Sequence, residues 1–117
     1  MTDYVIDTHV LFWYLAKSSR LSKRVSAALA DADSGQAIIH VPVIVLAELY
    51  YLNNKLGEPS DFVLTPSEPD HDLEFETDEA VADMRHRLIV GLAQRIGATV
   101  LTSDKKIIDS NIVPTIF

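Results

Sequence analysis

The sequence has no cysteine among its 117 residues, which excludes disulfide bonds and cysteine-ligated zinc. It also has no apolar run that is long and clean enough to cross a bilayer. The apolar stretch near the start is interrupted by Asp3, Asp7 and His9 and follows no basic leader, so we expect no signal peptide. These absences lead us to expect a cytoplasmic protein that is not attached to a membrane.

Positive charge is scarce as well, because 10 lysine and arginine residues face 17 aspartate and glutamate residues, giving a net charge of −7. This balance argues against a broad basic surface for nucleic acid. It does not exclude a nuclease, because carboxylates that hold a metal ion make the metal-free protein acidic. An acidic surface that only keeps the protein in solution explains the charge equally well.

The remaining composition, 48% hydrophobic and 23% charged, is typical of one globular domain, here residues 1–117. Strands and helices are predicted to alternate, which favours a three-layer α/β/α fold with a mostly parallel central sheet. The predicted strands are residues 3–7, 37–40, 73–76, 98–101 and 113–116. The predicted helices are residues 8–15 with Thr8 as cap, 22–34, 42–56, a short helix capped by Thr77, a separate helix at 87–96, and 104–108. Residues 58–72, which hold three prolines and several acids, are predicted to form a surface loop.

Glu48 is the most informative single residue, because it lies in the segment VIVLAELYYL, where nearly every neighbour is apolar. A helix of this composition is predicted to be buried almost all round. An ionised carboxylate is costly in such a place unless it is protonated, paired or bound to a metal ion. An ion pair with a buried arginine, or a glutamate at the edge of a crevice, explains Glu48 about as well as a functional role does.

Two aspartates stand at the carboxyl ends of predicted strands. Asp7 ends the first strand, and Asp104 follows the segment ATVLTS. Ligand sites of open parallel sheets lie outside these strand ends, so both side chains are expected to face the same crevice. Taken singly, each aspartate is better explained as a helix N-cap. Taken together with Glu48, they favour a cluster of acids.

Such a cluster has a chemical use. Three converging carboxylates repel one another, and one would be protonated unless a cation lay among them. Mg²⁺ and Mn²⁺ prefer sites built from a few carboxylates, waters and a substrate phosphate. The ion lowers the pKa of a bound water and stabilises charge on the departing oxygen of a phosphodiester. The pattern therefore favours a metal-assisted phosphodiesterase.

Four segments, YVIDTHVLFWYL, VPVIVLAELYYL, RLIVGLAQRIGATVLTSDKKI and VPTIF, follow one another along nearly the whole chain. Their order resembles the PIN-domain family, and within it the VapC-like toxins of prokaryotic toxin–antitoxin pairs. The resemblance implies a PIN-like α/β fold and an endoribonuclease that hydrolyses RNA with Mg²⁺ or Mn²⁺. It further implies a homodimer and a small antitoxin whose tail enters the active-site groove.

The same resemblance assigns roles to individual residues. It implies that Asp7, Glu48 and Asp104 bind the metal ion and support catalysis, and that Glu48 orients the metal-bound water or acts as base. Thr102 or Ser103 matches a small hydroxyl position that assists near the last acid.

The sequence departs from the family pattern at His86, which stands where a further aspartate is expected. A neutral imidazole suits Mn²⁺ better than Mg²⁺ but does not replace the negative charge. Asp83 lies one helical turn earlier and would reach the site only if the helix extends back that far. The segment between Glu48 and His86 also looks short for the family.

Candidate contacts for RNA phosphates are Arg85, Arg87 and Arg95, with Lys105 and Lys106 beyond them, although a solvated helix face explains each one better. Three functions are compatible with these features. A toxin-type ribonuclease comes first, and a degenerate, catalytically weak PIN domain that serves as a binding or regulatory module is the alternative. A phosphate-chemistry domain with Asp7 as nucleophile comes last, because His9 stands where a second acid is needed and no glycine-rich phosphate loop is present.

Overall fold

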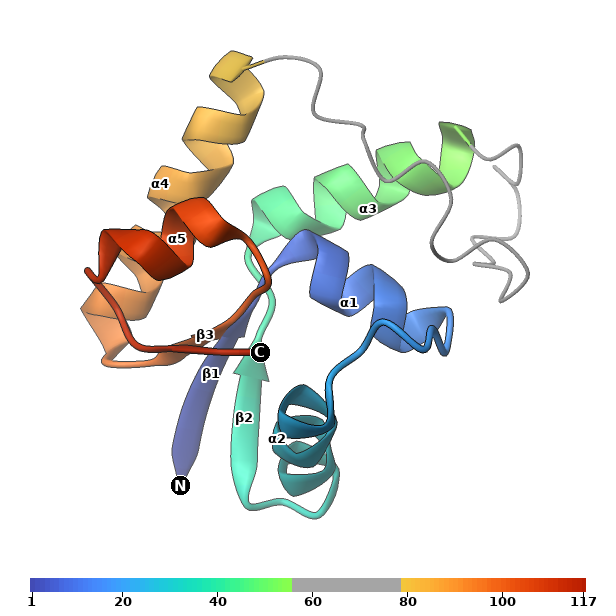
Figure 1. Ribbon diagram of the computed structural model, residues 1–117, viewed down its shortest axis with the longest axis vertical. Coiled ribbons are helices and arrows are strands. Elements are labelled where there is room, and N and C mark those ends of the chain that lie inside the picture. Colours follow the sequence, from blue (N-terminus) through green and yellow to red (C-terminus); the bar gives the residue numbers. More distant parts are fainter. Residues whose placement is uncertain (56–78) are drawn as a thin grey trace.

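All strand pairs of the sheet run parallel. The computed structural model describes residues 1–55 and 79–117, and side chains within them except at 52–55 and 79. Within that part, the strands lie in the order β2-β1-β3-β4, and Figure 1 labels β1, β2 and β3. They are β1 (Thr2–Ile6), β2 (Ala37–His40), β3 (Thr99–Leu101) and β4 (Thr115–Ile116). The predicted strand 73–76, the predicted loop 58–72 and the predicted cap Thr77 lie outside the described residues.

Helices connect these strands, as a parallel sheet requires. They are α1 (Thr8–Leu15), α2 (Lys23–Asp33), α3 (Val43–Lys55), α4 (Glu79–Ile96) and α5 (Lys105–Ser110). In Figure 1, α2 lies beside β2, and α1 runs close to α3. Most bounds fall within two residues of the prediction, because cap residues are present at the expected places. Ser22, for example, accepts a hydrogen bond from the Val25 N–H and opens α2.

The helix α4 differs from the prediction. A short helix after Thr77 and a separate helix at 87–96 were expected, whereas one helix runs unbroken through Glu79–Ile96. The prediction was wrong because residues 80–90 contain neither proline nor glycine, so nothing in the backbone interrupts the helix. The helix ends where expected, before Gly97, whose φ of 69° is a left-handed conformation that glycine adopts without strain.

Side chains alternate between the two faces of the sheet, as the pleat of a strand dictates. Val5 and Val100 point to the face covered by α3, α4 and α5. Ile6 and Leu101, their immediate neighbours, point to the face covered by α1 and α2. The sheet is therefore enclosed between two helical layers, which confirms the predicted three-layer α/β/α fold with a parallel sheet.

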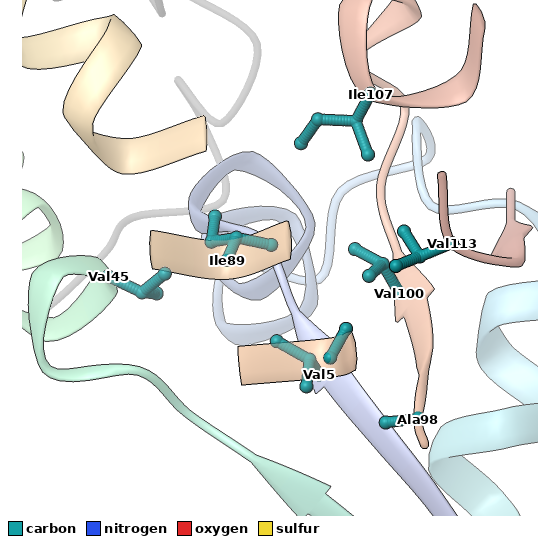
Figure 2. Close-up of a cluster of buried hydrophobic side chains, with 8 residues drawn as sticks. Val5, Val45, Ile89, Ala98, Val100, Ile107 and Val113 are labelled. Carbon is teal, nitrogen blue, oxygen red and sulfur yellow. The ribbon is translucent and has the colours of Figure 1, made fainter. Parts of the chain in front are cut away.

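Figure 2 shows the first of these cores, where labelled side chains from the sheet meet others from the helices of one layer. Ile89 of α4 and Val45 of α3 are fully buried in it. A second cluster lies where α1 meets α3, and there Phe12, Trp13 and Leu49 are buried against one another. This second cluster holds α3 against α1 and so fixes the helix that carries Glu48.

One face of α3 is exposed, contrary to prediction. The exposed side chains include Val43, Leu46 and Tyr50, which recur at the spacing of one helical face. The prediction was wrong because apolar composition alone does not reveal which side of a helix meets a partner element. Within residues 1–55 and 79–117, every helix falls short of the length and apolar character that crossing a bilayer requires.

Candidate active site

Strand pairing places Asp7 at the carboxyl end of the sheet. Ile6 of β1 pairs with Leu101 of β3, so the next residues, Asp7 and Thr102, leave the sheet side by side. The Thr102 hydroxyl donates to Asp7 Oδ2 at 2.6 Å, and the Asp7 N–H donates to the Leu101 carbonyl at 3.0 Å. Asp7 Oδ1 accepts from the Thr8 N–H at 2.7 Å. Asp7 therefore caps α1, and the expectation that Thr8 is the cap was wrong, because Thr8 is already the first helical residue.

Glu48 reaches the same place from the middle of α3. Its side chain is only 7% exposed, and its Oε1 atom accepts a hydrogen bond of 2.6 Å from the Thr8 hydroxyl. Thr8 thus touches two acids, with its N–H on Asp7 and its hydroxyl on Glu48. Because charge-assisted hydrogen bonds of this kind are strong and directional, the Thr8 contacts fix the positions of both carboxylates.

Asp104 enters the cluster through the turn after β3. Its N–H donates to Thr102 Oγ1 at 3.0 Å, so the Thr102 hydroxyl links the backbone of Asp104 to the carboxylate of Asp7. Asp104 Oδ1 accepts from the Lys106 N–H at 2.9 Å and caps α5. Both aspartates are therefore N-caps, the alternative that the sequence left open, and both also face the cluster. Ser103 lies half-buried between Thr102 and Asp104.

Arg85 of α4 joins the three acids. Its Nη1 atom lies 3.6 Å from Glu48 Oε2, its Nη2 atom 3.4 Å from Asp104 Oδ2, and its Nε atom 4.0 Å from Asp7 Oδ1. The Arg85 side chain is 2% exposed, so its charge is directed to these acids rather than to solvent. The ion pair with a buried arginine, which the surroundings of Glu48 left open, is thus present.

His86 lies at the accessible edge of the cluster. Its Nε2 atom shares a hydrogen bond of 2.5 Å with Asp104 Oδ2 and lies 3.2 Å from Arg85 Nη2. The side chains of His86 and Asp104 are 17% and 19% exposed, unlike the buried Asp7. His86 also lines a surface hollow together with Asp83 and Lys106. This edge is where the cluster meets solvent.

The pKa of Asp104 is set by opposing influences. Partial burial of Asp104 raises its pKa, but the Lys106 N–H, the hydrogen bond to His86 and the positive charges of His86 and Arg85 outweigh that cost. Together they hold the pKa of Asp104 below its ordinary value. Asp104 is therefore ionised throughout the neutral range.

The remaining candidates lie elsewhere. Arg87 is 80% exposed and pairs with Asp83 at 3.2 Å along the surface of α4. The helix does extend back to Asp83, as a compensating acid would require, but this ion pair turns its carboxylate to the surface.

In this arrangement the three carboxylates do not fit a divalent metal ion. Within the part of the chain that the structure describes, no group of three or more histidine, cysteine or acidic side chains could hold one. The Arg85 guanidinium lies among all three acids instead and supplies positive charge there.

Sequence reasoning missed the roles of Thr8 and of Arg85. Arg85 was predicted to contact RNA, whereas its side chain is buried among the acids. A signal was available, because Arg85, Ile89 and Ala93 recur every four residues and share one buried stripe of α4. Thr8 carried no comparable signal, since its contact with Glu48 depends on how α1 packs on α3.

Comparison with known proteins identifies the family of the chain. No curated protein and no solved structure matches the chain. The family model described as the PIN domain matches residues 4–111, a span that includes all three acids, Arg85 and His86. The chain therefore belongs to the PIN domain family, whose members are in general nucleases that act on RNA and depend on a divalent metal ion.

Proposed function

We propose that this chain is an endoribonuclease of the toxin–antitoxin type, VapC-like, which hydrolyses RNA phosphodiesters at the cluster of Asp7, Glu48 and Asp104. One observation carries the proposal. Three acids from separate parts of the chain lie within 4.0 Å of one guanidinium, at the carboxyl end of a parallel sheet. Open α/β sheets bind their ligands at this end, and the family is one of nucleases.

The residues of the cluster differ in exposure, and we assign their roles by this difference. Asp104 and His86 are the partly exposed members, so they are the groups placed to meet a substrate. Asp7 and Glu48 are buried and hold Arg85, which makes them positioning residues in this arrangement. Arg85 lies behind His86 and Asp104, where its charge offsets part of the negative charge of the acids.

Hydrolysis requires that a water attack phosphorus while its proton goes to a base and the departing oxygen regains a proton. We propose that the neutral His86 ring accepts the proton of the attacking water, while the departing oxygen takes a proton from solvent water at this accessible edge. Asp104 then stabilises the imidazolium that forms, because the two side chains already share a hydrogen bond. Lys106 beside the hollow and the exposed Arg87 are the proposed contacts of the RNA backbone.

The test is cleavage of a labelled single-stranded RNA by the purified chain. Asp104→Asn and His86→Ala should each lower the rate by at least about a hundredfold, the usual contribution of a general acid or base. Asp109→Asn is the matched control, since Asp109 is an exposed acid of the same helix α5, and it should cleave like the wild type. Equal rates for Asp104→Asn and Asp109→Asn would remove the assignment.

The same assay, run in EDTA and with added Mg²⁺ or Mn²⁺, reads the metal dependence that is general in the family. A rate that rises with either ion would support a metal-dependent reaction, and a rate unchanged by EDTA would support cleavage by His86 and Asp104 without a metal ion.

A second function is favoured by a separate observation. Arg85 already offsets part of the negative charge of the acids from within the fold, and His86 stands where the family resemblance leads one to expect an acid. Both features suit a degenerate PIN domain that serves as a binding or regulatory module. This alternative predicts no cleavage under any metal condition, together with tight binding of a small protein partner.

Two partners belong to the leading proposal. The first is a small antitoxin whose tail would occupy the hollow beside His86, and a tail peptide should then inhibit RNA cleavage competitively. The second is another copy of the chain, supported by the exposed apolar face of α3.

A further inference from the structure

We infer that Arg85 is the resident cation of the acid cluster and that it keeps divalent metal ions out of it. The inference concerns which cation the carboxylates hold, so it does not depend on whether the chain cleaves RNA. It departs from the metal dependence that is general in the family.

The charges of the cluster are the first support for this inference. Three carboxylates close together, two of them buried, are stable in the ionised form only beside positive charge. A guanidinium remains charged at every accessible pH, and its several N–H groups can face several acids at once. Arg85 uses three different nitrogens toward the three acids, so one side chain occupies the position that a metal ion would otherwise take and offsets part of the acids' charge.

The distances between the Arg85 nitrogens and the acid oxygens are the second support for the inference. Mg²⁺ binds oxygens at about 2.1 Å, which places opposite ligands about 4.2 Å apart. The Arg85 nitrogens stand 3.4 to 4.0 Å from the acid oxygens on their several sides, so these oxygens enclose a larger group than a metal ion. A divalent ion can enter only if the guanidinium leaves.

The position of Arg85 is built into the fold. The residue lies on the same stripe of α4 as Ile89 and Ala93, both buried, so the helix core fixes the start of its side chain. The acids have independent supports as well, since Thr8 and Thr102 donate hydrogen bonds to them. The carboxylates would therefore stay close together if Arg85 were shortened, and the vacated space would attract a cation.

The experiment uses the full chain and Mn²⁺ as the probe. Binding is measured by the electron paramagnetic resonance signal of free Mn²⁺ and by the melting temperature in EDTA and in Mn²⁺. The wild type should show no saturable binding and no rise in melting temperature. Arg85→Met should have a lower melting temperature than the wild type in EDTA and should regain part of that loss in Mn²⁺. Its affinity for Mn²⁺ should be at least about tenfold higher than that of the wild type, because the competing positive charge is gone.

Arg87→Met is the matched control, because it removes an arginine from the same helix at an exposed position. It should behave like the wild type toward Mn²⁺. If Arg85→Met does not fold, Asp7→Asn combined with Arg85→Gln removes one charge of each sign and should fold with Mn²⁺ binding still above that of the wild type.

Saturable, one-to-one Mn²⁺ binding by the wild type that equals binding by the Arg85 variants would overturn the inference. A folded Arg85 variant that binds no more Mn²⁺ than Arg87→Met would overturn it equally. RNA cleavage is not read in this experiment, so a failure of the proposed function leaves the result unaffected.

Discussion

At the scale of single residues, one hydroxyl connects two of the acids. Thr102 Oγ1 donates to Asp7 and accepts from the Asp104 N–H, and Thr102 is fully buried. No water can therefore take over either hydrogen bond without a change in packing.

Replacing this hydroxyl should be costly. Thr102→Val should lower the free energy of unfolding by about 1–3 kcal/mol, since it leaves a buried carboxylate oxygen of Asp7 without its donor. The measurement is the urea midpoint at neutral pH. Thr102→Ser keeps the hydroxyl and loses only a methyl group, which costs about 0.8 kcal/mol. A Val variant no less stable than the Ser variant would contradict the role of the hydrogen bond.

The pKa of Asp104 predicts how stability depends on pH. Because this pKa is lower in the folded chain than its ordinary value of 3.8, the unfolded chain binds the proton more readily. The stabilisation is therefore complete above that ordinary value and is lost as the pH falls through the lower folded pKa.

Asp104→Asn provides the check, because asparagine retains the N-cap but cannot ionise. The difference in unfolding free energy between wild type and variant should be constant from about pH 5 to 7, a range that lies at least about one pH unit above the ordinary aspartate pKa. It should shrink below about pH 4. A difference that grows as the pH falls would mean that the sign of the shift is wrong.

The residue scale also shows what the sequence could and could not predict about the site. Asp7 and Asp104 were predicted to share the crevice at the carboxyl edge because each directly follows a strand of a parallel sheet. Arg85 was not predicted to join them, because an arginine in a helix is usually solvated. Only its position on the same stripe of α4 as Ile89 indicates that it is buried.

At the scale of elements, the bounds of helices and strands were predicted best where a cap or a glycine marks them. The strand at residues 37–40 was predicted with the bounds that the structure has, and the first helix ends at Leu15 as predicted but begins one residue earlier, with Asp7 as its cap. The continuity of α4 was missed, because its first turns lack the apolar periodicity of its second half. Continuity matters to function, since Arg85 lies in the part that was predicted to be a break.

Two glycines of this region should respond oppositely to alanine. Gly97→Ala should destabilise by about 1 kcal/mol, because φ of 69° is unfavourable for a residue with a Cβ. Gly91→Ala should stabilise by about 0.5–1 kcal/mol, because it lies inside α4 and a new Cβ would meet nothing within 4 Å. Thermal unfolding of the two variants measures both, and a shift of the same sign would contradict the helix end at Gly97.

At the scale of the whole molecule, the parallel sheet and its two helical layers account for the position of the site. Crossover helices bring the chain back to the same end of the sheet after each strand, so acids distant in sequence meet there. Among the residues that the structure describes, the same architecture leaves a face of α3 uncovered, where Val43 is 80% exposed, Leu46 51% and Tyr50 58%.

An exposed apolar face of this kind usually marks an interface. Leu46→Glu should therefore convert a homodimer into a monomer in light scattering coupled to gel filtration, with an unchanged circular dichroism spectrum. Ile112→Glu is the control, because Ile112 is similarly exposed, at 56%, but lies after α5 rather than on α3. A wild-type chain that is already monomeric at high concentration would refute the dimer.

Trp13 has a practical consequence for all of these measurements. It is the sole tryptophan of the sequence, it is buried, and its ring lies 5.9 Å from that of Phe117. The contact joins α1 to the end of the last strand, and α1 begins at the acid cluster. The chain thus carries an intrinsic fluorophore whose emission should shift to longer wavelength when these parts separate, so unfolding can be followed without any label.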